Sequence, residues 1–203
     1  MPAVMLEACR SANLLMGGPK LSRLGITSTL REEGRTSVTL AFAAVQREDF
    51  GRSVIMVDLD LENPTLAQQH DLDPWPGMAE VIRGEARLDQ VLQPVAEGVH
   101  LITRGVITDG TARTASDMVK STFLEEAGRH ADIVIADLPP LIGRGPGLTA
   151  ARAFEELLLV VRAGVTPVAR VREAAADLSI MPNVLLNGSY TSLPRWIRRL
   201  LGK

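Results

Sequence analysis

Short apolar runs alternate along the chain with stretches in which apolar residues recur every three or four positions. The runs are bounded by charged or turn-forming residues, which is typical of strands buried on both faces of a sheet. They lie at residues 24–27, 53–57, 99–103, 133–136, 157–161 and 184–186. The periodic stretches predict helices at residues 5–16, 36–48, 112–130 and 167–179. This alternation predicts an α/β fold, with a doubly wound, mostly parallel sheet flanked by helices.

Length and composition limit the class of protein. The 203 residues, without an internal repeat or linker, predict a single domain over 1–203. A net charge of −2 gives no strongly basic face, so we expect no nucleic-acid partner. Only one cysteine is present, Cys9, and no stretch approaches the ~18 apolar residues that span a bilayer, so we expect a cytoplasmic protein. Cys9 is expected to pack among apolar neighbours, and His70, His100 and His130, which lack metal-ligand spacing, are interpreted as structural.

Polar side chains follow the predicted strands where this fold class binds its ligands. In an open parallel sheet, ligands lie outside the carboxyl ends of the strands. The residues found there are Gly34, Arg35, Thr36 and Ser37 at a helix start, Asp58 and Asp60, Asp137, and Asn187. We therefore expect two acidic turns and a Gly-Arg-Thr turn to meet at one edge of the sheet.

Such a corner suits a nucleotide, ATP or ADP, with Mg²⁺. A phosphate chain needs backbone N–H groups at a helix N-terminus and a cation, here Arg35. The metal needs a hydroxyl and carboxylates, here Thr36, Asp58 and Asp137. The alternative is that the aspartates cap helices or turns, that Arg35 lies in water, and that Asn187 forms a turn with Gly188.

Seven motifs in order give the chain a family resemblance. The first two are Glu7 and Arg10 of Glu-x-x-Arg-x-x-Arg, with Asn13 at the second Arg, and Ser28, Glu33, Gly34 and Thr36 of Ser-x-x-Pro-Gly-Glu-Gly-Lys-Ser-Thr. The next two are Asp58, Asp60, Leu61 and Pro64 of Asp-x-Asp-Leu-x-x-Pro and a glycine-bounded segment at 77–84. The last three are Asp137, Pro139 and Pro140 of Asp-x-Pro-Pro, residues 160–166 of Val-Val-Arg-x-x-x-Thr, and Asn187 at the last strand end. Over nearly the whole chain this order resembles the bacterial tyrosine kinases (BY-kinases) of the CpsD/CapB type, within the MinD/ParA class of P-loop ATPases.

The resemblance implies a function and partners. It implies catalytic roles for Asp58, Asp60 and Asp137, and an adenine contact for Asn187. It also implies a cytoplasmic regulator of exopolysaccharide or capsule polymerisation and export, at the inner face of the cell membrane. The partner would be a membrane polysaccharide co-polymerase. The helix within 1–20 corresponds to the subunit-contact helix of these kinases, which predicts a homo-oligomer.

The phosphate loop departs from the family pattern. Arg35 stands at the Lys position, Arg31 at Pro and Glu32 at Gly. A planar guanidinium does not replace an ammonium, and Glu32 adds a Cβ and a negative charge near a polyanion. Tyr190 is the single tyrosine, without the cluster that these kinases phosphorylate. We therefore hypothesise a pseudokinase.

Two alternatives stay open at this point. One is an active tyrosine autokinase or ATPase in which Arg35 substitutes for Lys. The other is a positioning ATPase of the MinD/ParA type, although Leu30 stands where that group usually has a second Lys. The segment 193–203 reads as a basic amphipathic helix that rests on a membrane surface or on its own domain.

Overall fold

The structure is a computed structural model, and it describes residues 1–142 and 145–188. Seven strands form one sheet in this part of the chain. They are β1 (Arg23–Ser28), β2 (Val54–Asp58), β3 (Gln93–Ala96), β4 (Val99–Ile102), β5 (Ile133–Asp137), β6 (Glu156–Arg162) and β7 (Asn183–Asn187). Their order is β3-β4-β2-β5-β1-β6-β7, and every pairing is parallel except that of β3 with β4.

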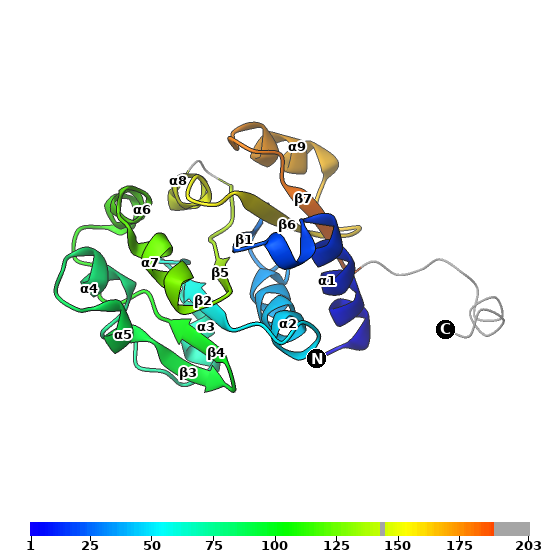
Figure 1. Cartoon of the computed structure of the whole chain (residues 1–203). Coiled ribbons are helices and arrows are strands. Elements are labelled where there is room, and N and C mark those ends of the chain that lie inside the picture. The colour runs from blue at the N-terminus through cyan, green and yellow to red at the C-terminus, as the bar shows by residue number, and fades with distance from the viewer. Residues whose placement is uncertain (143–144, 189–203) are drawn as a thin grey trace.

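Helices cover both faces of this sheet, as the sequence predicts for a doubly wound α/β fold (Figure 1). The first face is covered by α1 (Ala3–Leu15), α2 (Arg35–Glu48) and α3 (Thr65–Gln69). The second is covered by α4 (Met78–Ile82), α5 (Leu88–Val91), α6 (Thr111–Lys120), α7 (Phe123–His130), α8 (Pro146–Ala151) and α9 (Val168–Ala176). Alternate strand residues enter the two cores: Ile133 and Ile135 pack on one side, Val134 and Ala136 on the other.

The structure departs from the sequence predictions in one helix, and it adds the strand β3 and the short helices α3, α4, α5 and α8. The prediction of a single helix at 112–130 is wrong, because the helix is interrupted between α6 and α7. The Ser121 hydroxyl donates to the Met118 carbonyl at 2.8 Å and accepts from the Phe123 N–H at 3.3 Å, which replaces continuing helix bonds. The strand β3 was not predicted, since it is short, half-exposed and contains Pro94.

Helix α1 is fixed on α2 of the same chain. Arg10, which the family resemblance assigns to a subunit contact, pairs with Asp49 through Nε at 2.5 Å and Nη2 at 3.1 Å. Asn13 is fully buried and accepts from the Gln46 amide at 2.8 Å. Cys9 is also fully buried in the core, as expected. The motif residues of α1 therefore contact their own subunit, and the homo-oligomer stays a prediction.

Two further expectations concern membranes. The tail 193–203, with Tyr190 before it, lies outside the described residues. Within those residues, no helix combines the length and the apolar character needed to cross a bilayer.

The central strands place their carboxyl ends together. Because β5 lies between β2 and β1, Asp137 is the register partner of both Asp58 and Ile26. The Leu138 N–H donates to the Ile26 carbonyl at 2.8 Å, and the Leu59 N–H donates to the Asp137 carbonyl at 3.0 Å. The residues that follow these three strands are thereby brought to one edge of the sheet.

A close backbone contact near this edge gives a test of the fold. A Cβ at Gly77 would overlap the Gly105 nitrogen and the Thr103 carbonyl oxygen, both backbone atoms that side-chain motion cannot clear. We expect Gly77→Ala to lower the free energy of unfolding by about 1–3 kcal/mol, as overpacking does. Gly128→Ala in α7, where an added Cβ meets nothing within 4 Å, is the control and should be neutral or stabilising. Equal effects of the two substitutions in urea unfolding would contradict this packing.

Candidate nucleotide site

Five of the predicted site residues meet at the carboxyl edge of the sheet, namely three aspartates, Thr36 and Arg35. Asp58 and Asp137 end β2 and β5, Asp60 follows β2, and each of the three side chains is fully buried. Thr36, in the first turn of α2, donates its hydroxyl to Asp137 Oδ2 at 2.7 Å and lies 2.9 Å from the Thr65 hydroxyl. The convergence expected from the strand ends is therefore present in the structure.

Arg35 occupies the centre of this corner. Its guanidinium donates from Nε to Asp137 Oδ1 at 2.8 Å and from Nη2 to Asp60 Oδ2 at 2.5 Å. Only 9% of the residue is exposed. The guanidinium is therefore engaged by two carboxylates of its own chain.

The third carboxylate, that of Asp58, has a different environment. Its Oδ2 accepts from the N–H groups of Leu66 (3.0 Å) and Ala67 (3.3 Å), while Oδ1 has no hydrogen-bond partner. Burial, and after it the charge of Asp137, raises the pKa of Asp58 to about 7. Burial also raises the pKa of Asp137 to about 6, against the opposing effect of Arg35. Near neutral pH, Asp58 is therefore partly protonated and carries less of the local negative charge.

The residues as arranged do not fit a magnesium ion. Mg²⁺ requires oxygen ligands in near-octahedral geometry. The Thr36 hydroxyl and Asp137 Oδ2 are bonded to one another, and Asp137 Oδ1 is bonded to the Arg35 cation. Over the described residues, no three His, Cys, Asp or Glu side chains are grouped so that they could hold a metal ion. Among the three buried aspartates of this corner, Asp58 has an oxygen, Oδ1, without a hydrogen-bond partner in the described part of the chain.

The phosphate loop is held by contacts from its own chain, and Glu33 makes most of them. Its buried carboxylate accepts from the Leu30 N–H at 2.7 Å, from the Arg162 N–H at 3.1 Å and from the Thr166 hydroxyl. The Asn187 amide, which the resemblance assigns to adenine, donates to the Glu33 carbonyl at 2.8 Å. The loop after β1 is thus tied to the ends of β6 and β7.

Two backbone positions in the loop have positive φ. Gly34 has φ 88°, and a Cβ there would overlap the Asn187 amide nitrogen, so this position requires glycine. Glu32 has φ 63°, a left-handed conformation that side chains other than glycine rarely adopt. The loop therefore keeps the backbone path for which the family pattern uses glycine at position 32.

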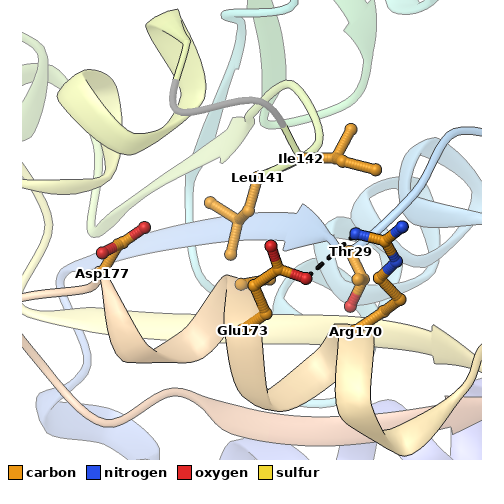
Figure 2. A pocket seen from close by; sticks show the side chains of 7 residues that line it. Thr29, Leu141, Ile142, Arg170, Glu173 and Asp177 are labelled. Carbon is orange, nitrogen blue, oxygen red and sulfur yellow. Dashed lines mark hydrogen bonds and ion pairs between the residues drawn. The ribbon is translucent and has the colours of Figure 1, made fainter.

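Cavities lie beside the loop, and two of them bear on the nucleotide. One of about 230 Å³ is lined by loop residues that include Gly34, Thr36 and the exposed Ser37. The other, of about 320 Å³, lies between the loop and α9, where Thr29 and Leu141 face Arg170 and Glu173 (Figure 2). Arg170 pairs with Glu173 at 3.0 Å, so this second wall does not offer the free cation that a phosphate chain requires.

The sequence predicts the convergence of the strand-end residues but not the contacts of Glu33, Thr65 and Arg35. Glu33 was matched to the family loop without a role. A signal was available, since an acidic residue beside a phosphate loop is unfavourable unless backbone N–H groups satisfy it. Its partners lie 129 and 133 positions away along the chain. Only the folded structure could name them.

Comparison with curated proteins finds bacterial tyrosine kinases, whereas no family model matches the chain. The tyrosine-protein kinase YwqD of Bacillus subtilis (strain 168) is 28% identical over 172 residues, which are 82% of this chain and 72% of YwqD. The tyrosine-protein kinase etk of Escherichia coli (strain K12) is 28% identical over 143 residues, 70% of this chain and 20% of that protein. A putative tyrosine-protein kinase in the cps region of Klebsiella pneumoniae is 27% identical over 159 residues, 78% of this chain and 20% of that protein. The chain thus spans only about a fifth of the last two relatives.

Solved structures give the same answer. The kinase domain of the Escherichia coli tyrosine kinase ETK superposes with a TM-score of 0.82 at 26% identity, over 93% of this chain and 77% of that one. A ParA family ATPase from Chlorobium tepidum superposes with a TM-score of 0.68 at 16% identity, over 90% of this chain and 81% of that one. The second likeness shows a common fold alone.

The raised pKa of Asp58 predicts how stability depends on pH. Between its ordinary value near 4 and about 7, the folded state binds more protons than the unfolded state. The contribution of Asp58 to the free energy of unfolding is therefore fully present below pH 4, and it is lost as the pH rises through 7. We expect Asp58→Asn to be more stable than the wild type at pH 8, by about 1–4 kcal/mol, and to show no such gain at pH 4.

Urea unfolding at several pH values checks this expectation. The control is Asp89→Asn, because Asp89 is an exposed carboxylate whose pKa the neighbouring Arg87 lowers. Parallel pH profiles for the wild type and Asp58→Asn would contradict the burial of an ionisable Asp58.

Glu33 gives a second test of the site. Glu33→Ala leaves two N–H groups and a hydroxyl without their acceptor in a buried place. We expect a loss of about 2–4 kcal/mol in the free energy of unfolding, because unpaired buried donors cost roughly 1–3 kcal/mol each when water cannot replace the acceptor. The neighbouring Glu32→Ala removes an exposed carboxylate and should change stability by less than about 0.5 kcal/mol. Equal losses for both variants would show that Glu33 does not hold the loop.

Sequence motifs, sheet order and comparisons agree. The kinase relatives cover most of the chain, and the ETK kinase domain superposes on nearly all of it. This chain is therefore a homologue of the bacterial tyrosine-protein kinases, with the P-loop fold that their kinase domains share with ParA-type ATPases.

Proposed function

We propose that this chain is a pseudokinase, a catalytically impaired BY-kinase relative that regulates exopolysaccharide or capsule polymerisation and export. It works in the cytoplasm by binding a membrane polysaccharide co-polymerase, without phosphoryl transfer. One observation carries the catalytic half of this proposal, namely the inward position of Arg35 between Asp60 and Asp137.

Phosphoryl transfer depends on a cation and a metal ion at the phosphates, which position the group and neutralise its charge. To reach a phosphate, the Arg35 guanidinium would have to leave two fully buried carboxylates. Removing one partner of a buried ion pair costs about 3–5 kcal/mol. Since each 1.4 kcal/mol changes a rate tenfold, this cost alone corresponds to a rate roughly 10²- to 4 × 10³-fold lower.

The metal half of the reaction is also impeded. The oxygens of Thr36 and Asp137 are engaged within the chain. Glu32 adds a negative charge at the mouth of the loop, where the phosphates of ATP would lie. ATP or ADP with Mg²⁺ is therefore expected to bind weakly or not at all.

The regulatory half of the proposal rests on the relatives. They are tyrosine-protein kinases, and the Klebsiella relative is described as lying in a cps region. The shared fold over most of the chain supports a partner of the same class, a co-polymerase. A peripheral membrane contact through 193–203 belongs to the same proposal and concerns residues outside those described.

One feature favours the alternative of an active ATPase or kinase. Asp58, Asp137 and Thr36 lie together at one edge of the sheet, which supports descent from a metal-dependent site. A positioning ATPase of the MinD/ParA type shares the fold, which by itself does not separate it from a kinase.

Calorimetric titration and a phosphotyrosine assay decide among these functions. We expect no binding heat for ATP or ADP at millimolar Mg²⁺, no phosphotyrosine, and ATP hydrolysis no faster than that of Asp58→Ala. The kinase YwqD, assayed in parallel, is the positive control.

Two results would contradict the proposal. Phosphotyrosine on Tyr190 or on a partner would establish the kinase alternative, and hydrolysis without phosphotyrosine would favour the ATPase. The partner is tested by co-purification with the cytoplasmic segment of a co-polymerase encoded in the same genome. Failure of that complex to form would remove the regulatory half.

A further inference from the structure

We infer that the Arg35 guanidinium is a built-in replacement for the divalent cation of this corner, so that the corner and the phosphate loop are assembled without metal or nucleotide. This inference rests on the proposed loss of catalysis, and it says that the conformation of the site does not depend on a bound ligand. A partner would meet the same surface whether or not nucleotide is present.

The first support is the charge of the corner. Asp58, Asp60 and Asp137 are three carboxylates with no exposed surface, gathered after two neighbouring strands. Like charges in a buried place repel one another strongly unless a cation or a proton compensates them. The structure supplies a cation, Arg35, that contacts two of the three.

The second support is the shape of the donor. A guanidinium is a planar fork, so separate nitrogens can bind separate carboxylates at fixed angles. Nε binds Asp137 and Nη2 binds Asp60, which joins the start of α2 to the end of β5 and to the turn after β2. A divalent cation coordinated by these groups would join the same elements. A lysine ammonium is a point charge on a flexible stem and lacks this fork.

The third support is that the remaining groups are satisfied around the guanidinium. Thr36 bonds Asp137, and Asp60 Oδ1 accepts from the Asn63 N–H at 3.1 Å. Glu33 and Asn187 close the loop onto β6 and β7. The contacts that a ligand would otherwise organise are therefore made by side chains of the chain itself.

Thermal unfolding and metal binding of the wild type and of variants at position 35 test the inference. The wild type is expected to keep the same unfolding midpoint, within about 1 °C, in EDTA, in millimolar Mg²⁺ and in Mg²⁺ with ADP, because the stabilisation by a ligand requires binding. Arg35→Ala is expected to lower the midpoint in EDTA by about 10 °C, the scale for losing one partner of a buried ion pair in a chain of this length.

The variants should also gain a metal site. With the guanidinium removed, Asp60 Oδ2 and Asp137 Oδ1 lose their donor and become hard oxygen ligands available to a cation, beside the unpartnered Asp58 Oδ1. Arg35→Ala should bind one Mn²⁺ by electron paramagnetic resonance and recover several degrees of its midpoint in Mg²⁺ or Mn²⁺. Arg35→Lys keeps the positive charge without the fork, and it serves if Arg35→Ala does not fold. It should lose fewer degrees and recover them in Mg²⁺ with ADP.

The matched control is Arg87→Lys, which alters an exposed Arg–Asp pair and should leave the midpoint and Mn²⁺ binding unchanged. Bound Mn²⁺ in the wild type, or a rise of its midpoint in Mg²⁺, would overturn the inference, as would an unchanged midpoint in both position-35 variants. These readouts are separate from those of the proposed function. Phosphotyrosine formation would end the pseudokinase proposal, while a wild-type chain that binds Mn²⁺ without phosphoryl transfer would end only the inference about Arg35.

Discussion

The structure at the sheet edge depends on the contact of Arg35 with the carboxylates of Asp60 and Asp137. The two aspartates have no exposed surface, and Arg35, whose guanidinium joins them, is a residue only 9% exposed. Each bond is charge-assisted, at 2.8 and 2.5 Å, in a place where water cannot compete. Because Arg35 opens α2, and the aspartates end β5 and follow β2, one side chain fixes the relative position of three elements.

A positively charged side chain, such as Arg35, differs in one respect from a metal ion that binds from solution. A metal ion arrives and leaves with its ligand, so the elements it joins can change state. A guanidinium carried on α2 is present at a constant effective concentration and cannot report whether nucleotide is bound. The superposition on the ETK kinase domain is compatible with such a fixed cation, because it compares backbone paths and not the source of the positive charge.

The sequence predicted the parallel strands because they are apolar runs with both faces buried, as in β2 and β5. It missed β3, where Pro94 and alternating exposure resemble a loop, and it merged α6 with α7 because Ser121 breaks the helix through local side-chain bonds that periodicity does not show. The strand-end rule brought Asp58, Asp137 and Thr36 to one edge correctly. The direction of the Arg35 side chain could not be predicted, because its partners Asp60 and Asp137 lie 25 and 102 positions away along the chain. Water or a phosphate could accept hydrogen bonds from the same guanidinium N–H groups.

The conformation of Glu32 indicates which parts of the loop are constrained. A residue other than glycine at φ 63° is strained by roughly 1–2 kcal/mol, and such strain persists only where the surroundings impose it. Those surroundings are the bonds made by Glu33 next to it and the amide of Asn187 against Gly34. If the loop had lost every constraint with its phosphate contacts, Glu32 could relax to an ordinary conformation. Its positive φ therefore argues that the path of the loop is maintained by the ends of β6 and β7, independently of the phosphate for which that path is suited.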